Sequence, residues 1–181
     1  MKSLKKCIVS LITVIAACGG VFAFAEETPP VDLSASVSVK LLFKMDIDKS
    51  VISFGRVLPG EWKNLGEGSY YNQVTCQSNN GKIWYLLISL SSPLTGARHN
   101  EKIPANKLKY MPGWTNGTGT VHDQYTFKEF GTEDSYVYTS NVEDAIANPI
   151  YIQFQYGVNV PDNGTADDYS ATVVYTMMEM L

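Results

Sequence analysis

The sequence predicts an all-β protein, folded as an antiparallel sandwich or barrel, and two observations lead to this fold class. First, apolar and polar residues alternate along several stretches, the longest from Val31 to Ile47, and side chains alternate between the two faces of a strand. Second, clusters of Gly, Pro, Asn and Asp separate these stretches, and none has the period of a convincing helix. About eight or nine strands joined by turns are typical of a sandwich or barrel.

The stretch from Val31 to Ile47 has one apolar and one polar face, interrupted only by Leu42 on the polar side. Fully extended, at about 3.3 Å per residue, it would span roughly 56 Å, whereas an ordinary strand has about 5–6 residues. Two interpretations therefore stay open. The strand bends and passes from one sheet to the other, or its first half leaves its own domain and pairs with another molecule. The apolar face consists of Val31, Leu33, Ala35, Val37, Val39, Leu41, Phe43, Met45 and Ile47.

Shorter strands and turns are predicted after this stretch. Val51–Phe54 reads as a short strand. Tyr70–Ser78 and Lys82–Leu90 are predicted to form a hairpin around Asn79-Asn80-Gly81, because Asn and Gly tolerate positive φ. In the second half of the chain we expect a loop, one helical turn and four strands: the loop Pro112–Gly119, the turn within Asn141–Asn148, and the strands Tyr125–Phe130, Tyr136–Ser140, Ile150–Val160 and Tyr169–Met180.

Residues 1–25 are predicted to be a secretory signal peptide. A basic start at Met1–Lys6 precedes the apolar run Cys7–Val21 and the possible cleavage site Ala23-Phe24-Ala25. The alternative is a membrane anchor, for which the apolar run is marginally short. Ile15-Ala16-Ala17-Cys18 also resembles a lipoprotein box, which would leave Cys18 lipidated. We expect a secreted or cell-surface protein with one domain, residues 26–181, that meets the membrane only through an uncleaved signal or this lipid.

Charge and cysteine content limit the partners of the processed chain. The signal holds three of the 14 Lys and Arg, so 11 remain against 18 Asp and Glu. A net acidic chain without a basic run is a poor partner for nucleic acid. Of the three cysteines only Cys76 lies outside the signal, so the processed chain has no intramolecular disulfide. We expect Cys76 to be a buried small apolar residue, with a reactive or intermolecular thiol as the alternative.

No catalytic motif stands out, and we expect neither an enzyme nor a cofactor. His99 and His122 lack metal-ligand spacing, and no nucleophilic Ser or Cys motif accompanies them. A turn cluster, Asp162, Asn163, Asp167 and Asp168, offers oxygen atoms to Ca²⁺, but its spacing is not that of an EF-hand. We expect ordinary turn residues here and no metal.

Two tryptophans are the candidate ligand-binding residues. Trp62 and Trp114 lie in Gly- and Pro-rich loops, and exposed aromatic rings on a β-sandwich can stack on sugars. The alternative is that both rings cap the ends of the core.

Short segments spaced along the chain resemble a known group of secreted bacterial proteins. In order, they are Ile52-Ser53-Phe54-Gly55, Val74-Thr75-Cys76, Leu108-Lys109-Tyr110, Val158-Asn159-Val160-Pro161 and Tyr169–Thr176. This order resembles the spore coat protein U and fimbrial-subunit group. The resemblance implies an antiparallel immunoglobulin-like β-sandwich of about eight or nine strands that is incomplete and polymerises by strand donation. Subunits of that group usually carry a disulfide, which this chain cannot form internally.

Together these observations predict a secreted, non-enzymatic structural subunit of a cell surface or fibre. Its partner would be another copy or another surface subunit, and the donated strand would contain Val31, Leu33, Ala35, Val37 and Val39. Two alternatives remain: the first strand serves its own domain, or the protein is a carbohydrate-binding module that uses Trp62 and Trp114.

Overall fold

The structure is a computed structural model that describes residues 36–179. The predicted signal peptide, Cys18, and the assembly candidates Val31, Leu33 and Ala35 lie outside these residues. The chain divides into two units, Met1–Ser38 and Val39–Leu181, and the fold described below belongs to the second.

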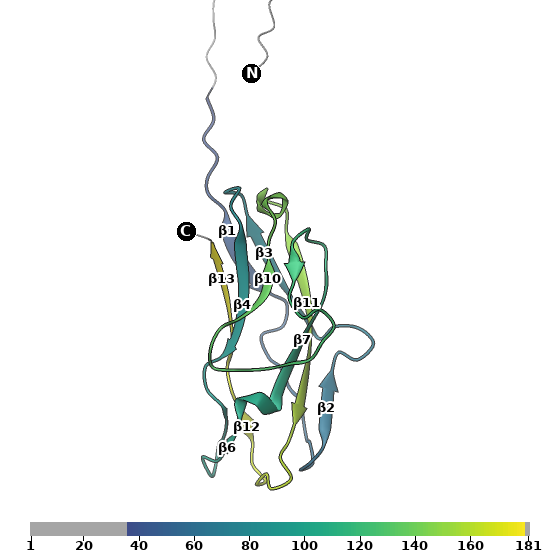
Figure 1. The fold of residues 1–181 in the computed structure, drawn as a ribbon. Helices are drawn as coiled ribbons and strands as arrows, with labels where there is room; N and C mark the ends of the chain where they lie inside the picture. The colour runs from purple at the N-terminus through teal and green to yellow at the C-terminus, as the bar shows by residue number, and fades with distance from the viewer. Residues whose placement is uncertain (1–35, 180–181) are drawn as a thin grey trace, which may run out of the picture. The chain divides into compact units, whose positions relative to one another are not determined.

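Two antiparallel sheets form a β-sandwich, which confirms the predicted fold class (Figure 1). Sheet A has the order β1 (Phe43–Ile47), β3 (Asn72–Ser78), β11 (Ile150–Asn159), β7 (Leu108–Thr115) and β9 (Lys128–Glu129), and β2 (Trp62–Leu65) also pairs with β11. Sheet B has the order β13 (Val173–Glu179), β4 (Trp84–Leu90), β10 (Ser135–Thr139) and β8 (Thr120–Val121). A small sheet C contains β12 (Tyr169–Ser170), β5 (Leu94–Gly96) and β6 (Lys102–Ile103). Two short 3₁₀ turns complete the described elements: η1 (Ala105–Lys107) and η2 (Val142–Ala145).

The core lies between sheets A and B and follows the alternation of the sequence. In β11, every second residue from Ile150 to Val158 is buried, and most residues between them are half-buried. Aromatic rings pack from one sheet onto the other, as in the edge contact of Phe154 with Tyr175 at a centroid distance of 5.4 Å. Cys76 is fully buried, as predicted, and burial raises the pKa of its thiol to about 12.

The predicted hairpin is wrong in its pairing, although both of its strands exist. β3 pairs with β1 and β11 in sheet A, whereas β4 pairs with β13 and β10 in sheet B. The turn at Asn79-Asn80-Gly81 therefore carries the chain across the sandwich. β4 is buried at almost every position, as expected of a central strand with neighbours on both sides and cover on both faces. The turn residues specify a reversal of the chain but not the sheet that receives the next strand.

Five other predicted segments differ from the structure. The predicted strand Tyr125–Phe130 is strand only at Lys128–Glu129, in β9, and the predicted strand Tyr169–Met180 is divided into β12 and β13, which belong to different sheets. The first described strand begins only at Phe43, and residues 36–42 lie outside strands. Val51–Phe54 is not a strand, although Ile52 and Phe54 pack against the core. The expected loop at Pro112–Gly119 is strand as far as Thr115. The ladder with β11 shifts register beside Pro112, and such irregularities are among the places where a sheet tolerates proline.

Candidate functional site

Two outer strands, β1 and β13, form free edges on the same side of the sandwich (Figure 1). Within residues 36–179, β1 pairs only with β3, and β13 pairs only with β4. The outer side of an edge strand presents unpaired backbone N–H and C=O groups, which can accept another strand. The edges at β1 and β13 are therefore two places where the sandwich can be extended; β9 and β8 lie at the opposite ends of the two sheets.

A cavity of about 150 Å³ opens between the two edges. We call it the edge groove, and it is lined by Met45, Asp46, Ile47, Val74 and Tyr175. The Tyr175 hydroxyl is hydrogen-bonded to that of Tyr156, so the polar end of this side chain is already satisfied. An apolar cavity of about this size can hold a molecule as large as benzene. The edge groove can therefore receive a branched aliphatic side chain.

The apolar face of β1 continues beyond the strand into solvent. Phe43 and Ile47 pack against the core, and Met45 is half-covered at 37% exposure. The preceding members of the same face are far more exposed, with 72% for Leu41, 83% for Val39 and 89% for Val37. We call Val37, Val39 and Leu41 the apolar stripe. Its alternation in the sequence matches that of β1, and each of its side chains is exposed.

Asn79 holds the chain to the sandwich immediately before β1. Its side-chain oxygen accepts from the Leu42 N–H at 2.7 Å, and its amide nitrogen donates to the Lys40 carbonyl at 2.9 Å. The Asn79 backbone N–H also donates to the Leu42 carbonyl at 3.0 Å. These bonds fix the point at which the chain leaves the sandwich, close to Val39 and Leu41 of the apolar stripe.

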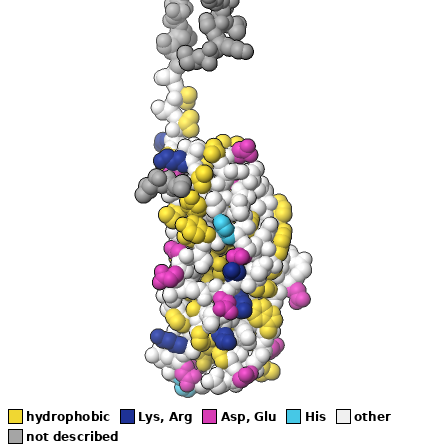
Figure 2. All heavy atoms as spheres, in the orientation of Figure 1, with side chains coloured by type: hydrophobic (Ala, Val, Ile, Leu, Met, Phe, Trp, Pro, Cys, Tyr) yellow, Lys and Arg dark blue, Asp and Glu magenta, His cyan; other side chains and the backbone are white. Residues whose placement is uncertain are grey.

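Apolar side chains are also exposed on β13. Val174 is 37% exposed and Met178 is 43% exposed. Figure 2 shows hydrophobic side chains at the surface where β13 and β4 lie. One of the two free edges is thus bordered by apolar surface.

Both candidate tryptophans lie on strands and not in the predicted loops, Trp62 at the start of β2 and Trp114 in β7. Trp62 packs edge-on against Phe127 at a centroid distance of 5.2 Å. Its ring also covers Gly157, where a Cβ would lie 2.0 Å from a Trp62 ring carbon. Trp114 is 48% exposed and lines a second, shallow cavity of about 140 Å³ together with Tyr125. Trp62 does not line this cavity.

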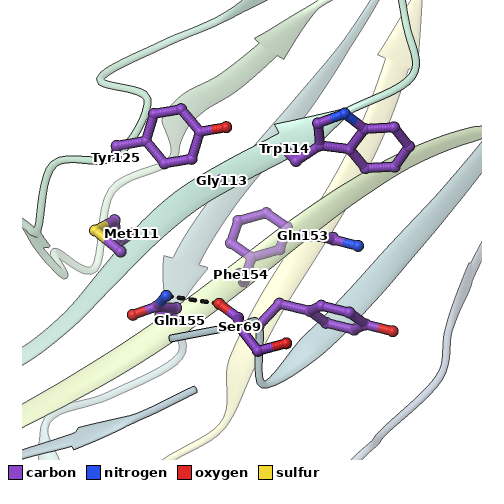
Figure 3. Close-up of a pocket in the computed structure, with 9 residues that line it drawn as sticks. Ser69, Met111, Gly113, Trp114, Tyr125, Gln153, Phe154 and Gln155 are labelled. Carbon is purple, nitrogen blue, oxygen red and sulfur yellow. Dashed lines mark hydrogen bonds between the residues drawn. The ribbon is translucent and has the colours of Figure 1, made fainter. Parts of the chain in front are cut away.

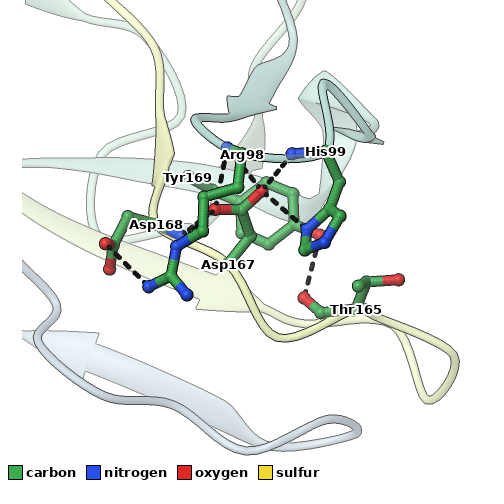
Figure 4. A network of polar contacts seen from close by, with 6 residues as sticks. All are labelled: Arg98, His99, Thr165, Asp167, Asp168 and Tyr169. Carbon is green, nitrogen blue, oxygen red and sulfur yellow. Dashed lines mark hydrogen bonds and ion pairs between the residues drawn. The ribbon is translucent and has the colours of Figure 1, made fainter.

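The acidic turn cluster contributes one structural carboxylate. Asp167 accepts backbone N–H bonds from Arg98, His99 and Asp168 at 2.8–3.1 Å, which join two loops (Figure 4). Burial opposes ionisation of Asp167, but these N–H donors outweigh it and lower its pKa to about 2. Asp162, Asn163 and Asp168 are exposed. Within residues 36–179, no three His, Cys, Asp or Glu side chains are grouped so that they could hold a metal ion.

The histidines lie in separate places. The His99 ring nitrogen Nδ1 is 3.3 Å from Asp167 Oδ2, and His122 Nε2 is 2.8 Å from Thr139 Oγ1. His99 is therefore part of the loop junction, whereas His122 lies beside the Thr139 hydroxyl of β10. Neither contact includes a nucleophilic cysteine or a second histidine.

Sequence reasoning missed a buried carboxylate at Asp144. It accepts from the Tyr138 hydroxyl at 2.6 Å and from the backbone N–H groups of Thr118, Gly119 and Asn141 at 2.8–3.0 Å. Burial raises its pKa, and the Thr118, Tyr138 and Asn141 bonds outweigh burial, so the pKa is lowered overall. Asn141 and Asp144 form a capping box at η2, and this spacing is the sequence signal that could have identified the residue.

No protein-family model matches this chain, and no curated protein matches it either. Within residues 36–179, no helix has the length and apolar character needed to cross a membrane.

Proposed function

We propose that the protein is a secreted, non-enzymatic structural subunit that builds a cell-surface or fibre assembly by strand donation between copies. The donated segment contains Val31, Leu33, Ala35, Val37 and Val39, and the receiving site is the edge groove of the next copy. The observation that carries the proposal is the apolar stripe, whose residues continue the sequence alternation of β1 and are exposed. Val31, Leu33 and Ala35 are included because they continue the same alternation in the sequence.

The free energy of apolar burial supports an occupant for the stripe. Burying a Val or Leu side chain that was exposed contributes about 1.5–3 kcal/mol. An added strand also gains backbone hydrogen bonds along a free edge, and its alternate side chains enter pockets. The free outer side of β1 or β13 would supply the hydrogen bonds, and the edge groove would supply one pocket.

We also propose that the sandwich is immunoglobulin-like and that the protein is related to the fimbrial-subunit group. The antiparallel sandwich, with its two free edges on one side, supports them. The chain departs from that group in its cysteine, because Cys76 is free and enclosed in the core.

The test places the same two charges on opposite faces of the donor segment. Residues 26–181 are prepared as wild type, as Val37→Asp/Val39→Asp and as the matched control Ser36→Asp/Ser38→Asp. All four positions are exposed, so we expect the thermal midpoint of each monomer to stay within about 2 °C of the others, since surface changes rarely exceed about 0.5 kcal/mol. Mass distribution is measured by multi-angle light scattering.

We expect wild type and the serine variant to form multimers and the valine variant to remain monomeric. Deletion of residues 26–37 should also give monomers. Unchanged assembly after this deletion would contradict the proposal. A large loss of thermal stability in the valine variant alone would instead show that the stripe serves its own domain.

A further inference from the structure

A second site, independent of assembly, lies on the outer face of sheet A. It is the shallow cavity of about 140 Å³ that Trp114 lines. Figure 3 shows the rings of Trp114 and Tyr125 on either side of Gly113, with Gln153 and Gln155 of β11 nearby. Gly113 leaves the space between the rings open, because it has no side chain to fill it.

The position of Tyr125 is enforced by its loop. Tyr125 has φ of 58°, a conformation that is strained for a bulky residue. Its backbone N–H donates to the Pro112 carbonyl at 2.8 Å, and the Gln124 side chain donates to the Gly113 carbonyl at 3.0 Å. These bonds hold the loop against β7 and leave the Tyr125 side chain 63% exposed. Strain of this kind persists where surrounding bonds impose it, and it is found often at ligand sites.

The chemistry of the cavity suits a neutral, hydroxyl-rich ligand. None of its nine lining residues is charged, in a chain that contains 18 acidic and 14 basic residues. Gln155 is oriented by donation from its amide nitrogen to the Ser69 carbonyl at 2.7 Å. The Gln153 amide nitrogen makes a longer bond of 3.4 Å to the Gln73 oxygen. A glutamine amide has two donor hydrogens and an acceptor oxygen, so Gln153 retains capacity for hydroxyl groups.

We propose that this cavity binds a neutral polysaccharide, with sugar rings stacked on Trp114 and Tyr125 and hydroxyl groups bonded to Gln153. The apolar faces of a pyranose match aromatic rings, and sugar hydroxyls both donate and accept, as the glutamine amide does. A proline-rich peptide also docks on aromatic rings, but it carries few groups that match the amide. The site therefore takes a glycan, and it differs from the Trp62–Trp114 pair that the sequence suggested.

The test uses five soluble neutral oligosaccharides as probes: the hexamers of cellulose, xylan, mannan, amylose and chitin. Binding is measured by calorimetry and by tryptophan fluorescence on the non-assembling Val37→Asp/Val39→Asp protein, which keeps polymerisation out of the signal. We expect at least one probe to bind, and Trp114→Ala and Tyr125→Gly each to weaken it tenfold or more. Tyr125→Gly also relieves the strained backbone, so this variant should remain folded.

Two further variants distinguish a loss of binding at this cavity from a loss of binding caused by misfolding. Gly113→Ala adds a methyl group whose nearest neighbours lie at 3.5 Å or beyond, so it should fold normally and weaken binding by partly filling the cavity. Tyr136→Ala removes a ring that is 52% exposed on sheet B and should bind as the parent protein does. The proposal is overturned if none of the five probes binds, if Trp114→Ala binds like the parent, or if decaproline binds at Trp114 while the sugars do not.

Discussion

Two carboxylates, Asp144 and Asp167, tie loops of the sandwich together through backbone N–H groups. Each accepts several of these bonds while its side chain is covered, so the neighbouring loops are fixed without a disulfide. Backbone donors favour the ionised form of a carboxylate, and in both residues they lower the pKa against the effect of burial. The free energy of unfolding should therefore decrease when the pH falls far enough to protonate these carboxylates.

Asp167→Asn should destabilise the folded protein at neutral pH but have less effect near pH 2. The folded-state pKa of about 2 lies below the unfolded value of about 3.9, so the folded state binds fewer protons between these values. The ionised Asp167 therefore stabilises the fold above about pH 4, and this contribution is lost as pH falls toward 2. We expect the difference in unfolding free energy between wild type and Asp167→Asn to shrink over that range, as measured by urea denaturation at successive pH values.

The control is Asn163→Gln, an exposed uncharged substitution in the same loop, whose profile should run parallel to that of wild type. A gap between wild type and Asp167→Asn that stays constant from pH 6 to pH 2 would contradict the role assigned to Asp167.

For single residues, the sequence predicted which side chains are buried better than it predicted their hydrogen-bond partners. Cys76 lies on the apolar face of a predicted strand, and it is buried. Asp144 had only the capping-box spacing with Asn141 as a signal, and Tyr125 had none, because their other contacts are with backbone groups of Thr118, Gly119 and Pro112. The contacts of Trp62 with Gly157 and Phe127 were not predictable either, since they join segments far apart in the sequence.

Among the strands, β1 is preceded by a backbone segment that the side chain of Asn79 holds in place. Asn79 makes two side-chain hydrogen bonds to the backbone just before β1, at Leu42 and Lys40. The turn that carries Asn79 was predicted, but its use as a clamp on another segment was not. The alternation from Val31 to Ile47 does not show where pairing begins, because apolar residues look the same whether the core or another molecule covers them.

Asn79→Ala should weaken the hydrogen bonding of the backbone just before β1. Each lost hydrogen bond costs about 0.5–1.5 kcal/mol, so the Leu42 amide should exchange with solvent about tenfold faster or more, as measured by NMR hydrogen exchange. Asn80→Ala is the matched control, because the Asn80 side chain bonds to Ser78, Lys82 and Glu179 instead. Equal Leu42 exchange rates in wild type and Asn79→Ala would refute the clamp.

β11 was predictable from its alternation, and so was the part of Tyr169–Met180 that forms β13, but their partners were not. Both strands turn the predicted faces toward the core, although the predicted final strand is interrupted between β12 and β13. β3 and β4 belong to different sheets because their partners, β11 for β3 and β10 and β13 for β4, lie much later in the chain. Local turn chemistry contains no information about those strands.

In the whole molecule, the proposed assembly depends on two free edges on one side of the sandwich and on an exposed apolar stripe. The antiparallel architecture was predictable from alternation and turn signals. The edge groove was not predictable, since it depends on β1 and β13 lying on the same side of two different sheets. The proposed donor and the proposed acceptor are separate features, so each can be disabled alone.

The most direct measurement mixes two disabled proteins and determines mass by native mass spectrometry. One carries Val37→Asp/Val39→Asp and keeps its groove. The other carries Met45→Lys, which places a charge at the groove on a half-exposed position where a lysine can reach solvent. Circular dichroism confirms that both are folded. Strand donation predicts that each protein alone is monomeric and that the equimolar mixture forms heterodimers and nothing longer. A mixture that stays monomeric, or long polymers from either protein alone, would contradict it.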